Sequence, residues 1–297
     1  MRTEDLSPRY EGLDAWSSLE AVNAMYEGQL SAVAAVREAL PAIVRAGEAA
    51  ALRLAEGGRL IYAGAGTSGR IGVQDGAELS PTFDWPEDRV VFAIAGGERA
   101  LRQSSENAED DREAARRTLE HHAIGTLDVV IGVAASGTTP YTVQFVQAAR
   151  ERAALTIAIA NNAATPLLTA AEHPILIVTG PEVLAGSTRM KAGTSQKVVL
   201  NLLSTLTMIR LGRVFHGQMV EMRARNAKLA RRAIAMVKHL ARCDDQTAKN
   251  ALTTAGGDLK LAILVARGID VETGRALLSR SSGHLRAALA EYEAKGE

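Results

Sequence analysis

Short apolar runs, each ending near Gly, Ser or Asn, recur through the middle of this 297-residue chain and constrain its fold more than any other feature. Runs this uniformly apolar are typical of parallel strands that are covered on both faces. The segments between them are long enough for helical crossovers. The pattern therefore predicts an α/β fold with a doubly wound, five-stranded parallel sheet. The expected strands are residues 59–63, 90–95, 129–134, 156–160 and 175–178.

Helical patterns come before this region. The pair Ser17-Ser18 can cap a first helix, and Pro41 opens a second. Apolar residues recur at helical spacing at Leu30, Val33, Val36 and Leu40. The second helix is expected to keep Ile43, Val44 and Leu52 inside.

Helical patterns also follow the sheet. A long helix over 191–213 carries a broad apolar face, which must be buried against the sheet or against another subunit. Its residues are Val198, Leu202, Thr205 and Ile209. Further helices are expected over 219–242, 245–255, 258–267 and 271–292. The predicted domains are an N-terminal arm with helices (1–54), a sheet domain (55–218) and a small helical domain (219–297).

Composition argues against several classes of function. Lys+Arg and Asp+Glu both number 34 and aromatic residues make up 4%, so no nucleic-acid interface is indicated. The apolar stretches contain polar residues too often for a membrane span, and the acidic N-terminus does not resemble a signal peptide. We therefore expect a cytoplasmic protein. The one cysteine, Cys243, is expected to be a small core residue rather than a nucleophile.

Two hydroxyl-rich turns follow two of the expected strands. One is Gly64-Ala65-Gly66-Thr67-Ser68-Gly69-Arg70, and the other is Ala134-Ala135-Ser136-Gly137-Thr138-Thr139. A strand that leads through such a turn into a helix directs backbone N–H groups and the positive end of the helix dipole at one point, which suits a phosphate. The alternative is that the hydroxyls only cap the helices. The phosphate interpretation gives as binding residues Thr67, Ser68, Gly69, Ser136, Gly137, Thr138 and Thr139.

Other nucleotide and metal patterns are absent from the sequence. No Walker lysine follows either turn, and no acidic residue stands where a dinucleotide would need one for its ribose. The histidines show no metal-ligand spacing, so we predict no metal and no cofactor.

Acidic residues could serve in catalysis or simply form a solvated face. Glu78 lies at the far end of the helix that Ser68 starts. Glu106, Glu109 and Glu113 share one face of a helix expected within 98–121.

A third junction, residues 186–194, joins a loop to the long helix and carries two cations and several hydroxyls. It either binds an anionic group of a ligand or caps the helix. The first interpretation makes Glu182, Ser187 and Lys191 ligand contacts.

Together these blocks resemble a known family. The two turns resemble the sugar isomerase (SIS) domain, and with residues 75–82, 106–110 and 186–197 they resemble the N-acetylmuramic acid 6-phosphate etherases. The resemblance covers nearly the whole chain. It implies a carbon–oxygen lyase of peptidoglycan recycling. Such an enzyme cleaves the D-lactyl ether of N-acetylmuramic acid 6-phosphate by elimination and rehydration, giving N-acetylglucosamine 6-phosphate and D-lactate.

The resemblance also implies the site and the assembly. Its catalytic pair falls on Glu78 and Glu109, which we assign as acid and base, and it implies a homodimer with the site at the subunit interface. An unbroken helix from Ser68 to Glu78 would separate them by about 15 Å. Glu78 must therefore fold back or serve the partner's site. The chain departs from the family pattern at Leu79-Ser80 and at Thr138, where the family has an arginine. It also departs near the N-terminus, where the family's Thr-Glu-x-x-Asn becomes Thr3-Glu4-Asp5-Leu6-Ser7. A non-catalytic sugar-phosphate regulator and an isomerase of the same fold are the alternatives.

Overall fold

The computed structural model describes residues 3–103, 107–222 and 227–295, and the chain divides into two compact units. The first unit comprises Met1–Ala77 and Glu87–Thr207, and the second comprises Glu78–Pro86 and Met208–Glu297. The first contains the sheet with its surrounding helices, and the second is mainly helical.

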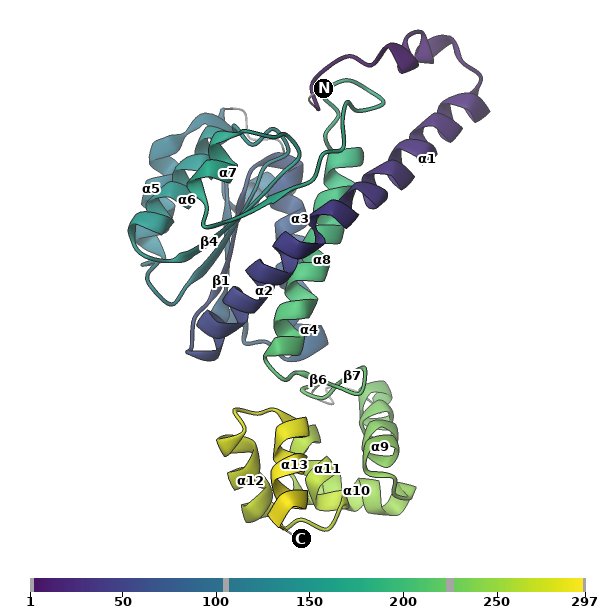
Figure 1. Cartoon of the computed structure of the whole chain (residues 1–297), viewed down its shortest axis with the longest axis vertical. Helices are drawn as coiled ribbons and strands as arrows, with labels where there is room; N and C mark the ends of the chain where they lie inside the picture. Colours follow the sequence, from purple (N-terminus) through teal and green to yellow (C-terminus); the bar gives the residue numbers. More distant parts are fainter. Residues whose placement is uncertain (1–2, 104–106, 223–226, 296–297) are drawn as a thin grey trace. The chain divides into compact units, whose positions relative to one another are not determined.

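The first unit is built on the predicted parallel sheet, whose five described strands lie in the order β2-β1-β3-β4-β5 (Figure 1). Each strand lies within two residues of its predicted bounds, so the fold prediction is confirmed. The strands are β1 (Leu60–Gly64), β2 (Val90–Ile94), β3 (Val129–Val133), β4 (Leu155–Ala160) and β5 (His173–Leu176).

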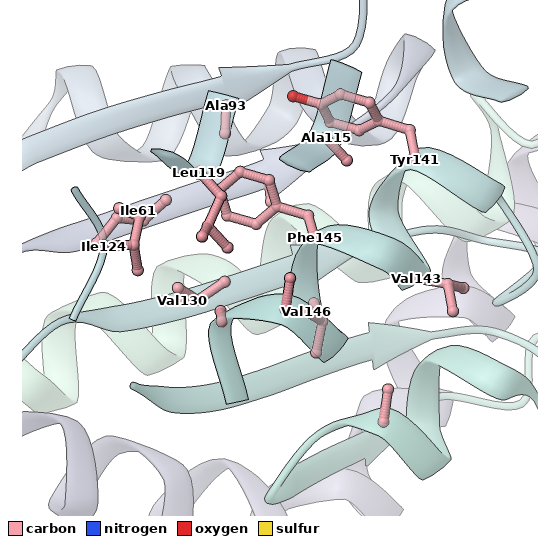
Figure 2. Packing of buried hydrophobic residues seen from close by; sticks show 14 of the residues in the cluster. Ile61, Ala93, Ala115, Leu119, Ile124, Val130, Tyr141, Val143, Phe145 and Val146 are labelled. Carbon is pink, nitrogen blue, oxygen red and sulfur yellow. The ribbon is translucent and has the colours of Figure 1, made fainter. Parts of the chain in front are cut away.

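Helices cover both faces of this sheet, as the continuous apolar strands require. On one face α5, α6 and α7 pack over the strands, and on the other α2 and α3 do so. Figure 2 shows the first layer, where Phe145 of α6 and Leu119 of α5 lie among strand residues such as Ile61 and Val130. The α-helices of this unit are α1 (Ser18–Ala35), α2 (Leu40–Ala55), α3 (Gly66–Ala77), α5 (Arg112–His121), α6 (Pro140–Glu151), α7 (Pro166–Ala170) and α8 (Lys191–Arg210), of which α8 ends in the second unit.

Short 3-10 turns complete the first unit. They are η1 (Pro8–Tyr10), η2 (Leu13–Ala15), η3 (Val36–Ala39), η4 (Glu87–Arg89), η5 (Glu98–Leu101) and η6 (Ala108–Asp110).

The N-terminal helices begin where the sequence predicts. Ser17 caps α1 by accepting a hydrogen bond from the Glu20 N–H, and the Glu20 carboxylate accepts one from the Ser17 N–H in return. The predicted inner face of α2 is only partly right: Ile43 is buried, but Val44 and Leu52 are 42% and 71% exposed. Besides Ile43 and Leu54, the buried residues of α2 are the small residues Ala46, Gly47, Ala50 and Ala51.

Gly47 illustrates how closely α8 packs against α2. A Cβ at Gly47 would lie 3.0 Å from Cδ2 of Leu206, so the α2–α8 contact leaves room only for small side chains.

The helix expected within 98–121 is broken. Only α5 is α-helical, and Asp111 caps it by accepting a hydrogen bond of 2.8 Å from the Ala114 N–H. Glu109 lies before that cap in η6, while Glu113 lies in α5, so the predicted shared helical face is wrong for this pair. Glu106 lies outside the described residues. The break follows Asn107, whose φ of 62° no helix accommodates.

The broad apolar face predicted for α8 is buried only in part. Val199 and Leu203, which belong to the same stripe, are buried within this chain, and Leu206 is half-buried. Leu202 and Ile209 are each 41% exposed, Val198 is half-buried and Thr205 is exposed. Burial within the chain therefore accounts for one side of the stripe and leaves the other side uncovered.

The second unit packs short helices around its own core, which includes Val237, Leu261 and Leu264. The segment predicted as one helix over 271–292 is two helices, because Ser282 and Gly283 both take positive φ values and turn the chain. A helix was expected from Met219, but this residue lies in a small hairpin. The elements are α4 (Leu79–Phe83), β6 (Val214–Phe215), β7 (Gln218–Met219), α9 (Ala227–Ala241), α10 (Asp245–Thr254), α11 (Leu259–Ala266), α12 (Val271–Arg280) and α13 (Leu285–Lys295). Within the described ranges, no helix has both the length and the apolar character needed to cross a bilayer.

Candidate active site

The order of the strands brings the two hydroxyl-rich turns together. After β1 the chain forms β2 on one side of β1 and then crosses back to form β3 on the other side. The connections that follow β1 and β3 therefore diverge from each other. Gly64 at the end of β1 pairs in register with Val133 at the end of β3. Ligands of such sheets bind beyond the carboxyl ends of the strands at this switch point.

A cavity of about 390 Å³ lies at this position. Its wall is rich in hydroxyl groups from both turns, and it also includes acidic side chains. The lining residues are Glu4, Ala65, Gly66, Thr67, Ser68, Glu109, Asp110, Ala134, Ala135, Ser136, Thr138, Thr139, Pro140 and Thr188.

The first turn is tight because its glycines touch. A Cβ on Gly64 would lie 3.0 Å from the Cα of Gly69, and a Cβ on Gly69 would lie 3.0 Å from the Gly64 carbonyl. This contact seats the start of α3 directly on the end of β1. Ser68 is buried there, and its hydroxyl donates a 2.9 Å hydrogen bond to Oε1 of Gln196. The Ser68 oxygen can still accept hydrogen bonds through its lone pairs, but its hydrogen is already donated to Gln196.

The second turn is held by its own hydroxyls. The Ser136 hydroxyl oxygen accepts hydrogen bonds of 3.1 Å from the N–H and from the hydroxyl of Thr138. Thr139 precedes α6, yet its side chain makes no capping hydrogen bond. The capping alternative therefore does not account for Thr139. Gly137 has a φ of 69°, and its α-carbon lies against Thr165.

The three acidic side chains of the wall come from two places. Glu109 and Asp110 come from η6, Glu4 comes from the N-terminal arm, and all three are exposed. Among the residues that the structure describes, neither a lysine nor an arginine lines the cavity. Glu78 belongs to the second unit, where it is exposed and directly precedes α4. Among the described residues, no three His, Cys, Asp or Glu side chains gather closely enough to bind a metal ion.

The third junction is organised by a buried carboxylate. Both oxygens of Glu182 accept hydrogen bonds of 2.9 Å, one from the Lys191 N–H and one from the Ala192 N–H. Burial raises the pKa of Glu182, although these hydrogen bonds oppose the shift. Lys191 donates from Nζ to the Pro181 carbonyl, and burial lowers its pKa. This geometry favours the capping alternative for Glu182.

Of the residues expected to bind the ligand, Thr67, Ser68, Ser136, Thr138 and Thr139 line the cavity. The cavity wall does not include five others, namely Gly69, Gly137, Glu182, Ser187 and Lys191.

Sequence reasoning missed three polar side chains of the cavity wall, those of Glu4, Asp110 and Thr188. Thr188 lies inside the third junction, and Asp110 follows Glu109, so both adjoin features that the sequence did single out. Glu4 lies about sixty residues before the first turn, and its signal in the sequence was the Thr3-Glu4 pair, which matches the start of the N-terminal block of the etherase family.

The chain matches two family models and is similar to several known proteins. The family model described as "Glucokinase regulatory protein N-terminal SIS domain" matches residues 42–150, and the model described as "SIS domain" matches residues 101–206. An N-acetylmuramic acid 6-phosphate etherase of Deinococcus radiodurans is 47% identical over 99% of this chain and 97% of its own length. The etherase of Streptomyces coelicolor is 48% identical over 98% of this chain and 94% of its own length. A solved phosphoheptose isomerase from Francisella tularensis is 18% identical, with a TM-score of 0.49 over 66% of this chain and 98% of its own.

Proposed function

Because this chain belongs to the N-acetylmuramic acid 6-phosphate etherase family, we propose that it is a carbon–oxygen lyase that releases D-lactate from N-acetylmuramic acid 6-phosphate. The second product is N-acetylglucosamine 6-phosphate. The structural observation that carries this proposal is the cavity between β1 and β3, where two hydroxyl-rich turns and Glu109 share one wall.

The turns suit the phosphate end of the substrate. Thr67 and Ser68 lie at the start of α3, and Thr138 and Thr139 lie at the start of α6, so two helix N-termini face one cavity. Hydroxyl groups and backbone N–H groups bind a phosphate without a lysine or arginine, although less tightly than an Arg fork does. Gly69 and Gly137 contribute indirectly, because their lack of a side chain permits the tight geometry of each turn.

Glu109 suits the role of base. The ether oxygen leaves from sugar carbon 3 after a base removes the proton from carbon 2, which is acidified by the open-chain aldehyde at carbon 1. An exposed carboxylate beside the phosphate site can take that proton. Water then adds across the carbon 2–carbon 3 double bond, placing its hydroxyl on carbon 3, and carbon 2 regains a proton that originates from solvent.

Glu78 is the proposed acid. It protonates the departing lactyl oxygen, so that lactate does not have to leave as an alkoxide. Glu78 directly follows α3, the helix that begins at the first turn.

One assay decides between lyase and alternative functions. Wild-type protein is incubated with N-acetylmuramic acid 6-phosphate in deuterated water, and D-lactate and deuterium at carbon 2 of the sugar product are measured. A lyase gives both, whereas a regulator or an isomerase releases no lactate. We expect Glu109→Gln to lower kcat by at least about a hundredfold. Glu113→Gln is the matched control, because Glu113 is also exposed but does not line the cavity. Equal rates for the two variants would contradict the role of Glu109.

We also propose that the protein works as a homodimer with its site at the subunit interface. Large apolar residues lie exposed along α1 at spacings of three and four, and Leu202 and Ile209 of α8 are exposed as well. A second copy with the same exposed faces is a suitable occupant. The exposed residues on α1 are Leu19, Val22, Tyr26, Leu30 and Val33.

Mixing inactive variants tests whether the site is shared. If Glu78 serves the partner's site, a mixed dimer of Glu78→Gln and Glu109→Gln subunits contains one intact site. Random re-association of equal amounts should then restore about a quarter of wild-type lactate release. Activity that stays at zero in a mixture shown to contain mixed dimers would mean that each subunit uses its own Glu78.

A further inference from the structure

The N-terminal arm is fixed to the wall of the cavity by one side-chain pair. Thr3 is fully buried, its N–H donates a 3.0 Å hydrogen bond to Oδ1 of Asn162, and its hydroxyl oxygen accepts one of 3.0 Å from Nδ2. The same Nδ2 group lies 3.3 and 3.4 Å from the carbonyl oxygens of Ala135 and Ser136. The arm is therefore attached to the second turn itself.

This attachment determines where the next residue lies. Glu4 lines the cavity together with both turns and Glu109. Its carboxylate lies against the loop before α8, since a Cβ at Gly186 would lie 2.8 Å from Oε2 of Glu4. Glu182 lies close enough that, after burial, the charge of Glu4 contributes to its raised pKa. The carboxylate is thus held between this loop and the cavity.

We propose that Glu4 is a substrate-binding residue that accepts a hydrogen bond from a hydroxyl or the amide N–H of the amino sugar. This inference rests on the proposed function and deepens it. A carboxylate repels the phosphate and the lactyl carboxylate, so its useful partners are the neutral donors of the sugar. The two turns bind the phosphate from one side, and Glu4 orients the ring from another.

Substitution at Glu4 separates this role from others. A hydrogen bond to a charged group is strong enough that Glu4→Ala should lower kcat/KM for lactate release by about 10- to 100-fold. Glu4→Gln keeps an acceptor oxygen and should lose less than about tenfold. Glu11→Gln is the control, because it removes an exposed carboxylate from the same arm outside the cavity. A kcat/KM for Glu4→Ala within about twofold of wild type, or a KM that falls because repulsion is relieved, overturns the proposal.

The attachment of the arm gives a second, independent measurement. Thr3→Val removes the hydroxyl that pairs with Asn162 while leaving the second turn unchanged. Alone it should lower kcat/KM in the same direction as Glu4→Ala, and in the Glu4→Ala background it should have little further effect. If the effects of Thr3→Val and Glu4→Ala on kcat/KM were fully additive, the proposal that the arm acts by placing Glu4 would be contradicted.

Binding of the product distinguishes failure of this inference from failure of the proposed function. N-acetylglucosamine 6-phosphate is titrated into wild type and Glu4→Ala by calorimetry. If wild type binds the product but releases no lactate, the lyase proposal fails, and a weaker product affinity of Glu4→Ala still supports the role of Glu4. Equal affinities overturn that role. A wild type that neither binds the product nor releases lactate overturns both.

Discussion

Replacing Asp75 with alanine should destabilise the first unit more than any exposed substitution, because Asp75 joins three elements from a buried position. Asp75 is 5% exposed near the end of α3. Its carboxylate accepts hydrogen bonds of 2.8 Å from the Tyr62 hydroxyl of β1, 2.7 Å from Nδ2 of Asn201 and 3.1 Å from the Ser204 hydroxyl of α8. Alanine removes all three acceptor contacts.

The size of the loss follows from which donors are buried. The hydroxyls of Tyr62 and Ser204 belong to buried residues, and each costs about 1–3 kcal/mol when left without a partner. Asn201 is exposed, so water can replace its lost contact. The two buried donors together predict a loss of about 2–6 kcal/mol in the free energy of unfolding. Asp75→Asn keeps an oxygen that accepts from Asn201 and Ser204, and its amide N–H can donate to the Tyr62 oxygen. Its loss in the free energy of unfolding should therefore be less than about half that of Asp75→Ala.

Hydrogen–deuterium exchange measures this loss within the affected unit. For Asp75→Ala, amides of β1, α3 and α8 that exchange only when this unit opens should exchange at least about thirtyfold faster than in wild type. Urea unfolding followed by circular dichroism gives the corresponding global value. An alanine variant within about 0.5 kcal/mol of wild type would refute the reasoning. So would an asparagine variant as unstable as the alanine variant.

The ionisation of Asp75 adds a dependence on pH. Burial raises its pKa, although the hydrogen bonds from Tyr62, Asn201 and Ser204 oppose the shift. The native state therefore holds the Asp75 proton more tightly than the unfolded chain does. This contribution is fully present below the unfolded pKa of about 3.9 and is lost as the pH rises through the native pKa. The stability of wild type relative to Asp75→Asn should fall over that window, and a rise there would contradict the assigned direction.

Two further changes test the turns and the third junction. Gly137→Ala forces a side chain onto a residue with a φ of 69° and places its Cβ 2.3 Å from the Thr165 hydroxyl oxygen, so it should cost about 2–5 kcal/mol in urea unfolding. Gly125→Ala, where a Cβ meets nothing within 4 Å, should stay within about 0.5 kcal/mol. Glu182→Gln leaves one backbone N–H of α8 without its acceptor and should cost about 1–3 kcal/mol near pH 4. Because burial raises the pKa of Glu182, that cost should shrink as the pH rises above the unfolded pKa of about 4.3, and a cost that grows with pH would contradict the shift.

Features that depend only on residues close together along the chain could be predicted from the sequence. The five strands, both hydroxyl-rich turns and the capped start of α1 follow from apolar runs, glycines and a serine with a glutamate three residues later. Each of these patterns extends over only a few residues, so it can be recognised in the sequence without the tertiary structure. The parallel order of the strands also predicted that both turns lie at one edge of the sheet.

The inner face of α2 was predicted wrongly from its apolar residues. Val44 and Leu52 are as apolar as Ile43, yet both are exposed, and at 100° per residue Leu52 lies on the side of the helix opposite Ile43. The period of the buried residues does locate the inner face. What the period does not specify is the close approach of α8, which leaves room only for a small residue at position 47.

Sequence by itself determined the fold, the family and the two turns that form the cavity, because short-range patterns and family blocks specify them. Only the tertiary structure decided which distant side chains share that cavity and its support. The hydrogen-bonded pair Thr3–Asn162 brings Glu4 to the cavity wall across about 160 residues of sequence, and Asp75 meets Asn201 across 126. The physical reason is that such contacts form only after the sheet has brought the ends of its strands together, so no local pattern of residues encodes them.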